Sequence, residues 1–198
     1  MSKLIAVVGA SGIGNTTLVR ALASAFPFVT AYEQHAERPF QALFKSDARY
    51  ALANQVDYLV LRAEQEQFLR LDPQPGLIDG GLDLDFQGFT RLFHRRGLLT
   101  DPEFDLCRRL YELVRQSLPP PELVVRLRAA EETVARRLAG RDRINIARPE
   151  DTALLDSLLD AWIASLPAGE VLELDVSLET PDYRQSVELI LETVQARL

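Results

Sequence analysis

The chain has 198 residues, of which 47% are hydrophobic and 26% are charged, so it is long enough to bury one hydrophobic core without disulfide bonds. Its formal net charge of -7 at pH 7 argues against a nucleic acid polymer as the main partner. The single cysteine, Cys107, excludes an intramolecular disulfide, and no apolar run approaches the roughly 20 residues that would make the chain a membrane protein.

Short segments typical of strands alternate with longer helical ones. Strands are predicted at residues 4–9, 28–32, 76–80, 122–127 and 170–176, and helices at 15–25, 46–71, 84–96, 103–117, 130–140, 150–165 and 182–197. The alternation indicates a parallel sheet with helices on both faces, in a single domain over residues 1–198. The first strand follows the N-terminus without the features of a signal peptide, so we expect a cytoplasmic protein.

Between the first strand and the first helix the sequence GASGIGNTT has the spacing of a P-loop. Turn amides and a helix N-terminus in this context form an anion site. Thr16 stands where a P-loop hydroxyl holds Mg²⁺, whereas Asn15 occupies the lysine position and carries no charge. A dinucleotide-binding turn or simple tight packing is the alternative. The predicted nucleotide-binding residues are Gly9, Ala10, Ser11, Gly12, Ile13, Gly14, Asn15, Thr16 and Thr17.

The helix predicted at 46–71 carries Gln55 and Arg62, which lie seven residues apart. Two helical turns place both on one face with Leu52 and Leu59, so two polar side chains interrupt a core stripe. An amide beside a fixed cation suits the edge of a nucleobase. The alternative is that both side chains flank the stripe and reach solvent.

The third predicted strand ends in Asp79, which Gly80 and Gly81 follow. At the carboxyl end of a parallel strand an aspartate can reach a metal ion or its water. Asp-Gly-Gly is also ordinary turn chemistry, so a turn without a catalytic role is the alternative.

After the fourth predicted strand the chain carries Arg137, Arg141 and Arg143. Arg137 and Arg141 share a helical face, and closure of this segment could bring planar donors onto a phosphoryl group. Cations near the negative end of a solvated helix are the alternative interpretation.

Together these motifs resemble the deoxynucleoside kinase family almost from end to end. That family has a P-loop, a Glu-Pro motif, a glutamine and an arginine on a long helix, an acidic-Arg-Ser motif and an arginine-rich lid. The resemblance implies a three-layer, P-loop kinase-like α/β domain with a five-stranded parallel sheet, and a lid around residues 136–148. It also implies ATP and Mg²⁺ as cofactors, a nucleoside and a nucleoside triphosphate as partners, and a homodimer.

The resemblance also assigns roles to individual residues. Glu33 falls on the glutamate of the Glu-Pro motif, the base toward the nucleoside 5′-hydroxyl, although Gln34 replaces the proline. The implied catalytic residues are Glu33, Asp79, Arg137, Arg141 and Arg143, the implied nucleoside-binding residues are Glu33, Phe44, Gln55, Arg62 and Asp85, and the implied metal ligands are Thr16 and Asp79.

Two departures from the family remove positive charge from the phosphate side: Asn15 replaces the P-loop lysine, and Gly80 replaces the motif arginine. The only lysines, Lys3 and Lys45, are not placed near the loop by the strand assignment. We therefore expect an ATP-dependent kinase of nucleosides or deoxynucleosides with slowed transfer, which lysine at position 15 and arginine at position 80 would speed. The alternative is a catalytically weak or inactive nucleoside-binding protein on the same fold.

Overall fold

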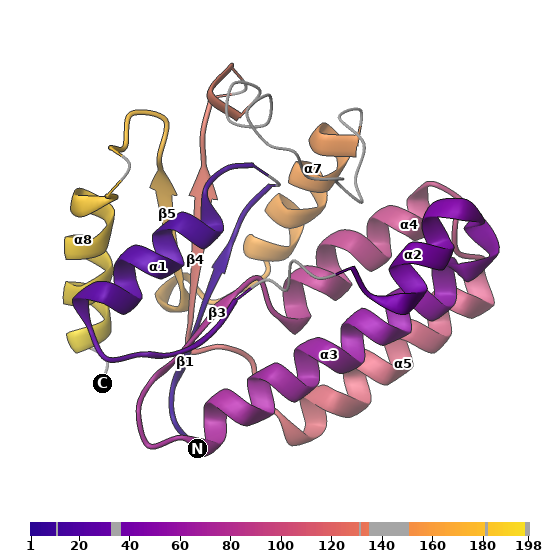
Figure 1. The fold of residues 1–198 in the computed structure, drawn as a ribbon, viewed down its shortest axis with the longest axis horizontal. Coiled ribbons are helices and arrows are strands. Elements are labelled where there is room, and N and C mark those ends of the chain that lie inside the picture. Colours follow the sequence, from indigo (N-terminus) through magenta and orange to yellow (C-terminus); the bar gives the residue numbers. More distant parts are fainter. Residues whose placement is uncertain (11, 33–36, 131, 135–150, 181, 197–198) are drawn as a thin grey trace.

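Five parallel strands form one sheet in the described part of the chain (Figure 1). The structure is a computed structural model that describes residues 1–10, 12–32, 37–130, 132–134, 151–180 and 182–196. The strand order is β2-β3-β1-β4-β5, so the predicted five-stranded parallel sheet is confirmed. The strands are β1 (Leu4–Val8), β2 (Val29–Ala31), β3 (Gly76–Asp79), β4 (Leu123–Arg128) and β5 (Val171–Asp175).

The first strand is apolar on both sides because it lies in the centre of the sheet. Ile5 and Val7 face a core cluster with helices α1 (Asn15–Ala25) and α8 (Arg184–Gln195). Ala6 and Val8 face a second cluster with α3 (Ala51–Leu71), α7 (Thr152–Ile163) and the helix η2 (Leu84–Thr90). Helices therefore cover both faces, and the prediction of a three-layer α/β fold is confirmed.

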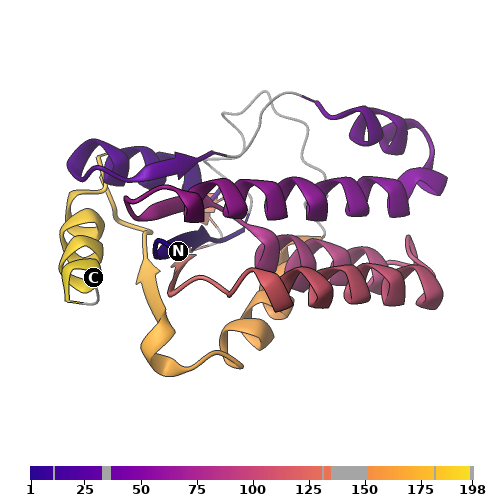
Figure 2. The same ribbon diagram turned by 90° about the horizontal axis from the view of Figure 1, so that it is seen from below.

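Helices α3 and α5 (Asp101–Ser117) run side by side and extend past the sheet (Figures 1 and 2). Helix α2 (Pro39–Ser46) lies against α3, followed by the short 3₁₀ turn η1 (Ala48–Tyr50). A second 3₁₀ turn, η4 (Ala168–Glu170), leads into β5. No helix among the described residues is both long enough and apolar enough to cross a membrane.

Two of the predicted helices differ in the structure. The segment predicted as one helix over 84–96 is divided into η2, which has π-helical geometry, and α4 (Arg91–Arg95). The helix predicted to begin at 46 begins at Ala51, and α2 was not predicted, although Pro39 at its first position is a known start signal. The helix predicted at 130–140 lies largely outside the described residues.

A buried group of charged side chains joins α3, α5 and the start of η2. Glu66, which is fully buried, accepts hydrogen bonds from Arg115 Nη1 at 2.7 Å and from the backbone N–H of Leu82 at 2.9 Å. Asp83 accepts from Arg115 Nε at 3.0 Å and from the Tyr111 hydroxyl at 2.7 Å. Burial, with the nearby Asp83 carboxylate, raises the pKa of Tyr111 to about 12. The group fixes the helices that carry the candidate site.

We predict that Arg115→Met lowers the free energy of unfolding by about 3–5 kcal/mol, because it leaves two buried carboxylates without their cation. Urea denaturation measures the loss. Arg108→Met is the matched control on the same helix: its partner Glu112 is half exposed, so that change should cost less than about 1 kcal/mol. Equal losses in the two variants would contradict a structural role for the buried group.

Candidate functional site

The loop that joins β1 to α1 is tightly curled at the carboxyl edge of the sheet. Gly12 and Gly14 have φ of 86° and 118°, in the left-handed region that favours glycine. A Cβ at Gly9 would lie 2.7 Å from Ile13 Cγ2 and 2.8 Å from Asn15 Oδ1, so only glycine fits there. Helix α1 begins at Asn15, directly after the turn. A glycine turn that leads into a helix N-terminus has the geometry of an anion site.

The side chain of Asn15 is turned back onto this loop. Its Nδ2 donates to the carbonyl of Gly9 at 3.2 Å, and its buried Oδ1 has no hydrogen-bond partner among the described residues. Neither lysine of the chain replaces the missing positive charge. Lys3 directly precedes the N-terminal end of β1, opposite the end that carries the loop, and Lys45 forms an ion pair with Glu37. The amide thus stabilises the shape of the loop without contributing a cation.

Thr16 and Asp79 are brought together from α1 and the end of β3. The Thr16 hydroxyl donates to Asp79 Oδ2 at 2.5 Å, and the aspartate is 3% exposed. The register of the sheet explains why the two side chains are close. Asp79 of β3 lies opposite Val7 of β1, two residues before the loop begins. A hydroxyl and one carboxylate suit Mg²⁺, which takes its remaining ligands from water and phosphate oxygens.

Position 80 does not accept a side chain without strain. Gly80 has φ of 91°, and a Cβ there would lie 3.1 Å from Arg62 Nη2. A residue other than glycine in this conformation costs about 1–2 kcal/mol. The expectation that arginine at position 80 would speed transfer is therefore not supported by the local geometry, because the Arg62 guanidinium already occupies the adjacent space.

Gln55, Arg62 and Asp85 point into the protein and are 2%, 6% and 5% exposed. Arg62 Nε donates to Asp85 Oδ2 at 2.6 Å, and its Nη1 donates to the carbonyl of Asp79 at 3.1 Å. Burial raises the pKa of Asp85, and the adjacent Arg62 opposes that rise. The alternative in which Gln55 and Arg62 flank the core stripe and reach solvent is wrong.

Thr90, at the end of η2, joins this group and was missed by sequence reasoning. Its hydroxyl lies 2.9 Å from Gln55 Oε1 and 3.0 Å from the carbonyl of Asp85. The single hydroxyl proton of Thr90 can be donated to Gln55 Oε1 or to the carbonyl of Asp85, so Thr90 links the two residues. Asp85 and Thr90 are five residues apart, and the π-helical geometry of this turn brings residues at that spacing together. No sequence signal predicted the π-helical turn.

Not every predicted site residue joins these two groups. Phe44 packs in α2 against Phe93, with ring centroids 5.1 Å apart, and belongs to a hydrophobic cluster. The remaining predicted residues Ser11, Glu33, Arg137, Arg141 and Arg143, together with the whole segment 136–148, lie outside the described residues.

Comparisons with known proteins agree with the resemblance to deoxynucleoside kinases. Residues 5–196 match the family model described as deoxynucleoside kinase. The chain is 26% identical to deoxyadenosine kinase of Dictyostelium discoideum over 140 residues, which are 70% of this chain and 57% of that protein. It is 21% identical to deoxyadenosine/deoxycytidine kinase of Bacillus subtilis (strain 168) over 200 aligned positions, covering 98% of this chain and 92% of that protein.

Solved structures share the fold. The structure of deoxyadenosine kinase from M. mycoides with bound dATP has a TM-score of 0.78 at 17% identity, covering 97% of this chain and 99% of that chain. The same enzyme with bound dCTP has a TM-score of 0.77 at 16% identity, covering 98% of this chain and 99% of that chain. At these identities the likeness concerns the fold.

We predict that Asn15→Lys tightens the binding of MgATP by about tenfold or more, because it adds a charge-assisted contact to the phosphates. Titration calorimetry measures the affinity. Asn15→Met is the matched control, since it also loses the bond to Gly9 but adds no charge. If the lysine variant binds MgATP no better than the methionine variant, the loop does not cradle phosphate.

Proposed function

The chain belongs to the deoxynucleoside kinase family, and from that premise we propose that it transfers the terminal phosphoryl group of ATP to the 5′-hydroxyl of a deoxynucleoside. One observation carries the proposal. The group at Gln55 and the pair at Thr16 belong to a single series of hydrogen bonds that runs through Thr90, Asp85, Arg62 and Asp79. A base-binding end and a phosphate-binding end are thereby held at a fixed separation.

We infer that the substrate carries a base with an exocyclic amino group. The two curated relatives are named for deoxyadenosine and deoxycytidine, whose bases share an amino donor beside a ring-nitrogen acceptor. A glutamine amide matches that edge with one acceptor and one donor. Arg62 and Asp85 would hold the opposite side of the base pocket.

In the proposed reaction the P-loop amides and the N-terminus of α1 hold the phosphates. The Thr16 hydroxyl and the Asp79 carboxylate would hold Mg²⁺, which supplies charge neutralisation between the phosphates when bound. Glu33 would take the proton of the nucleoside 5′-hydroxyl. The hydroxyl oxygen would then bond to the γ-phosphorus while the bond between the γ-phosphorus and the departing ADP breaks. Arg137, Arg141 and Arg143 would stabilise the transferring group.

The second candidate function is a nucleoside-binding protein that catalyses little. The orientation of Asn15 favours it, because the side chain at the lysine position bonds to Gly9 and brings no charge to the phosphates. One missing donor can slow such a step by about 10² to 10³. Binding without turnover would identify this second function.

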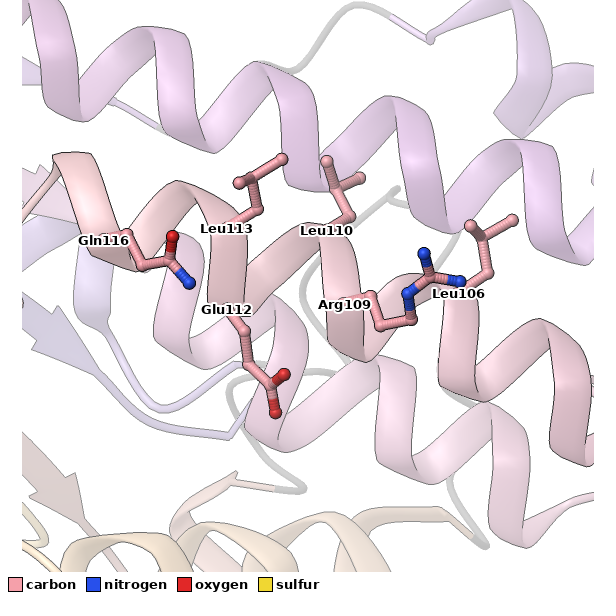
Figure 3. A pocket seen from close by; sticks show the side chains of 6 residues that line it. All are labelled: Leu106, Arg109, Leu110, Glu112, Leu113 and Gln116. Carbon is pink, nitrogen blue, oxygen red and sulfur yellow. The ribbon is translucent and has the colours of Figure 1, made fainter.

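We also propose a homodimer formed through the outer faces of α3 and α5. Large apolar side chains on these helices are exposed, and the hollow in Figure 3 is lined by Leu106, Leu110 and Leu113 of α5. A second hollow lies between α5 and α3. Contiguous exposed apolar surface is typical of an interaction site. The exposed apolar residues of the two helices are Val60, Phe68, Leu71, Leu106 and Leu113.

We predict ATP consumption that depends on an added nucleoside, with deoxyadenosine or deoxycytidine preferred over thymidine. Gln55→Ala should lower kcat/KM by about tenfold or more while the protein stays folded, because one bidentate base contact is worth about 1–3 kcal/mol. A coupled ADP assay with a nucleoside panel measures this. The control is Gln74→Ala, at an exposed glutamine outside the site.

Three outcomes separate the candidates. Nucleoside-dependent ATP consumption supports the kinase. Calorimetric nucleoside binding without consumption supports the binding protein, and absence of both overturns the proposed function.

We predict that Leu113→Glu converts the dimer to a monomer, because it buries a charge in the proposed interface. Sedimentation velocity measures the assembly state. Leu178→Glu is the matched control, since Leu178 is a 97% exposed leucine outside α3 and α5. A monomeric parent protein, or a Leu113→Glu variant that remains dimeric, would rule out this interface.

A further inference from the structure

Asn54 is a buried polar side chain on α3. It is 0% exposed, yet neither its Nδ2 nor its Oδ1 has a hydrogen-bond partner among the described residues. Buried polar groups in proteins are almost always hydrogen-bonded, because an unpaired one loses its bonds to water and gains none in return. A donor and an acceptor that no described residue pairs on the same side chain are therefore available to a ligand.

The position of Asn54 on α3 indicates what that partner is. At about 100° per residue, Asn54 lies on the strip of the helix between Gln55 and Asp57. Gln55 is attached to η2 through Thr90, whereas Asp57 accepts two hydrogen bonds of 2.5 Å from Arg38 at the start of α2. Asn54 thus faces the space between the attachments of η2 and α2.

The same strip continues into the group at Arg62. Gln65 lies three turns beyond Asn54 on almost the same side of α3. Its Oε1 accepts from Arg62 Nη1 at 3.0 Å, and its Nε2 lies 3.5 Å from the carbonyl of Tyr32, directly after β2. The strip that carries Asn54 therefore borders the proposed nucleoside site along its length.

We propose that Asn54 is a nucleoside-binding residue that presents a second amide, adjacent to Gln55, to the base edge. The inference rests on the proposed function and adds to it a residue that assigns specificity. Asn54 Oδ1 would accept the amino hydrogen that Gln55 leaves unpaired, and Nδ2 would donate to N7 of an adenine base, on the other side of its amino group. Two consecutive amides on one rigid helix hold that edge more selectively than one does.

The test is Asn54→Leu, which keeps the volume of the side chain and removes its polar atoms. Calorimetry should show deoxyadenosine binding weakened by about tenfold or more. The affinity for a purine deoxynucleoside that lacks the amino group should fall less, because that nucleoside cannot form the contact between Asn54 and the amino group even in the parent protein. Thermal unfolding without nucleoside should stay equal or shift upward, since the variant removes an unpaired buried amide. Leu22→Met, at a buried leucine of α1 on the other face of the sheet, is the control and should leave the nucleoside affinity unchanged.

The possible results decide between a ligand role and a structural one. If Asn54→Leu binds both nucleosides as the parent does, or if it loses stability while its affinity is unchanged, Asn54 is structural and this inference fails while the proposed function stands. If the parent binds no nucleoside, the proposed function fails first and this inference with it. Asn54→Ala provides the same comparison if the leucine variant does not fold.

Discussion

The buried guanidinium of Arg62 holds together the parts of the site that β3, α3 and η2 contribute. It binds the side chain of Asp85 and the carbonyl of Asp79, and its Nη2 lies beside Gly80. A buried charge is tolerated only when its partners are in place, so this one cation constrains three elements at once. Asp79 is hydrogen-bonded to Thr16, and Asp85 is linked to Gln55 by hydrogen bonds of Thr90, so Arg62 also helps to fix the positions of Thr16 and Gln55.

The parallel sheet makes such a constraint possible. β1 lies between β3 and β4, so the loop after β1 and the aspartate that ends β3 emerge side by side at one edge. A second buried group, around Glu66 and Arg115, fixes α3 against α5 and η2. The site is therefore supported both by the sheet and by the charged group around Glu66 and Arg115.

Positive charge is distributed unevenly along this site. The end proposed to bind the base has a buried arginine, while the described part of the end proposed to bind phosphate has backbone amides and the uncharged Asn15. Charge at the phosphates governs the transfer step more than it governs recognition of the base. In the proposed function, nucleoside binding and phosphoryl transfer would thus depend on separate residues, so that the first could be retained while the second is slowed.

The sequence by itself determined the parallel α/β architecture, the glycine loop and the placement of Gln55 and Arg62 on one helix face, because strand alternation, local turn chemistry and helical periodicity are all short-range signals. It did not reveal the π-helical turn that brings Thr90 to Gln55, the left-handed backbone of Gly80 or the buried amide of Asn54, which no described residue pairs. Each of these depends on packing between segments distant along the chain. The tertiary structure alone decides which polar side chains are buried and which find a partner, since desolvation is a property of the assembled fold.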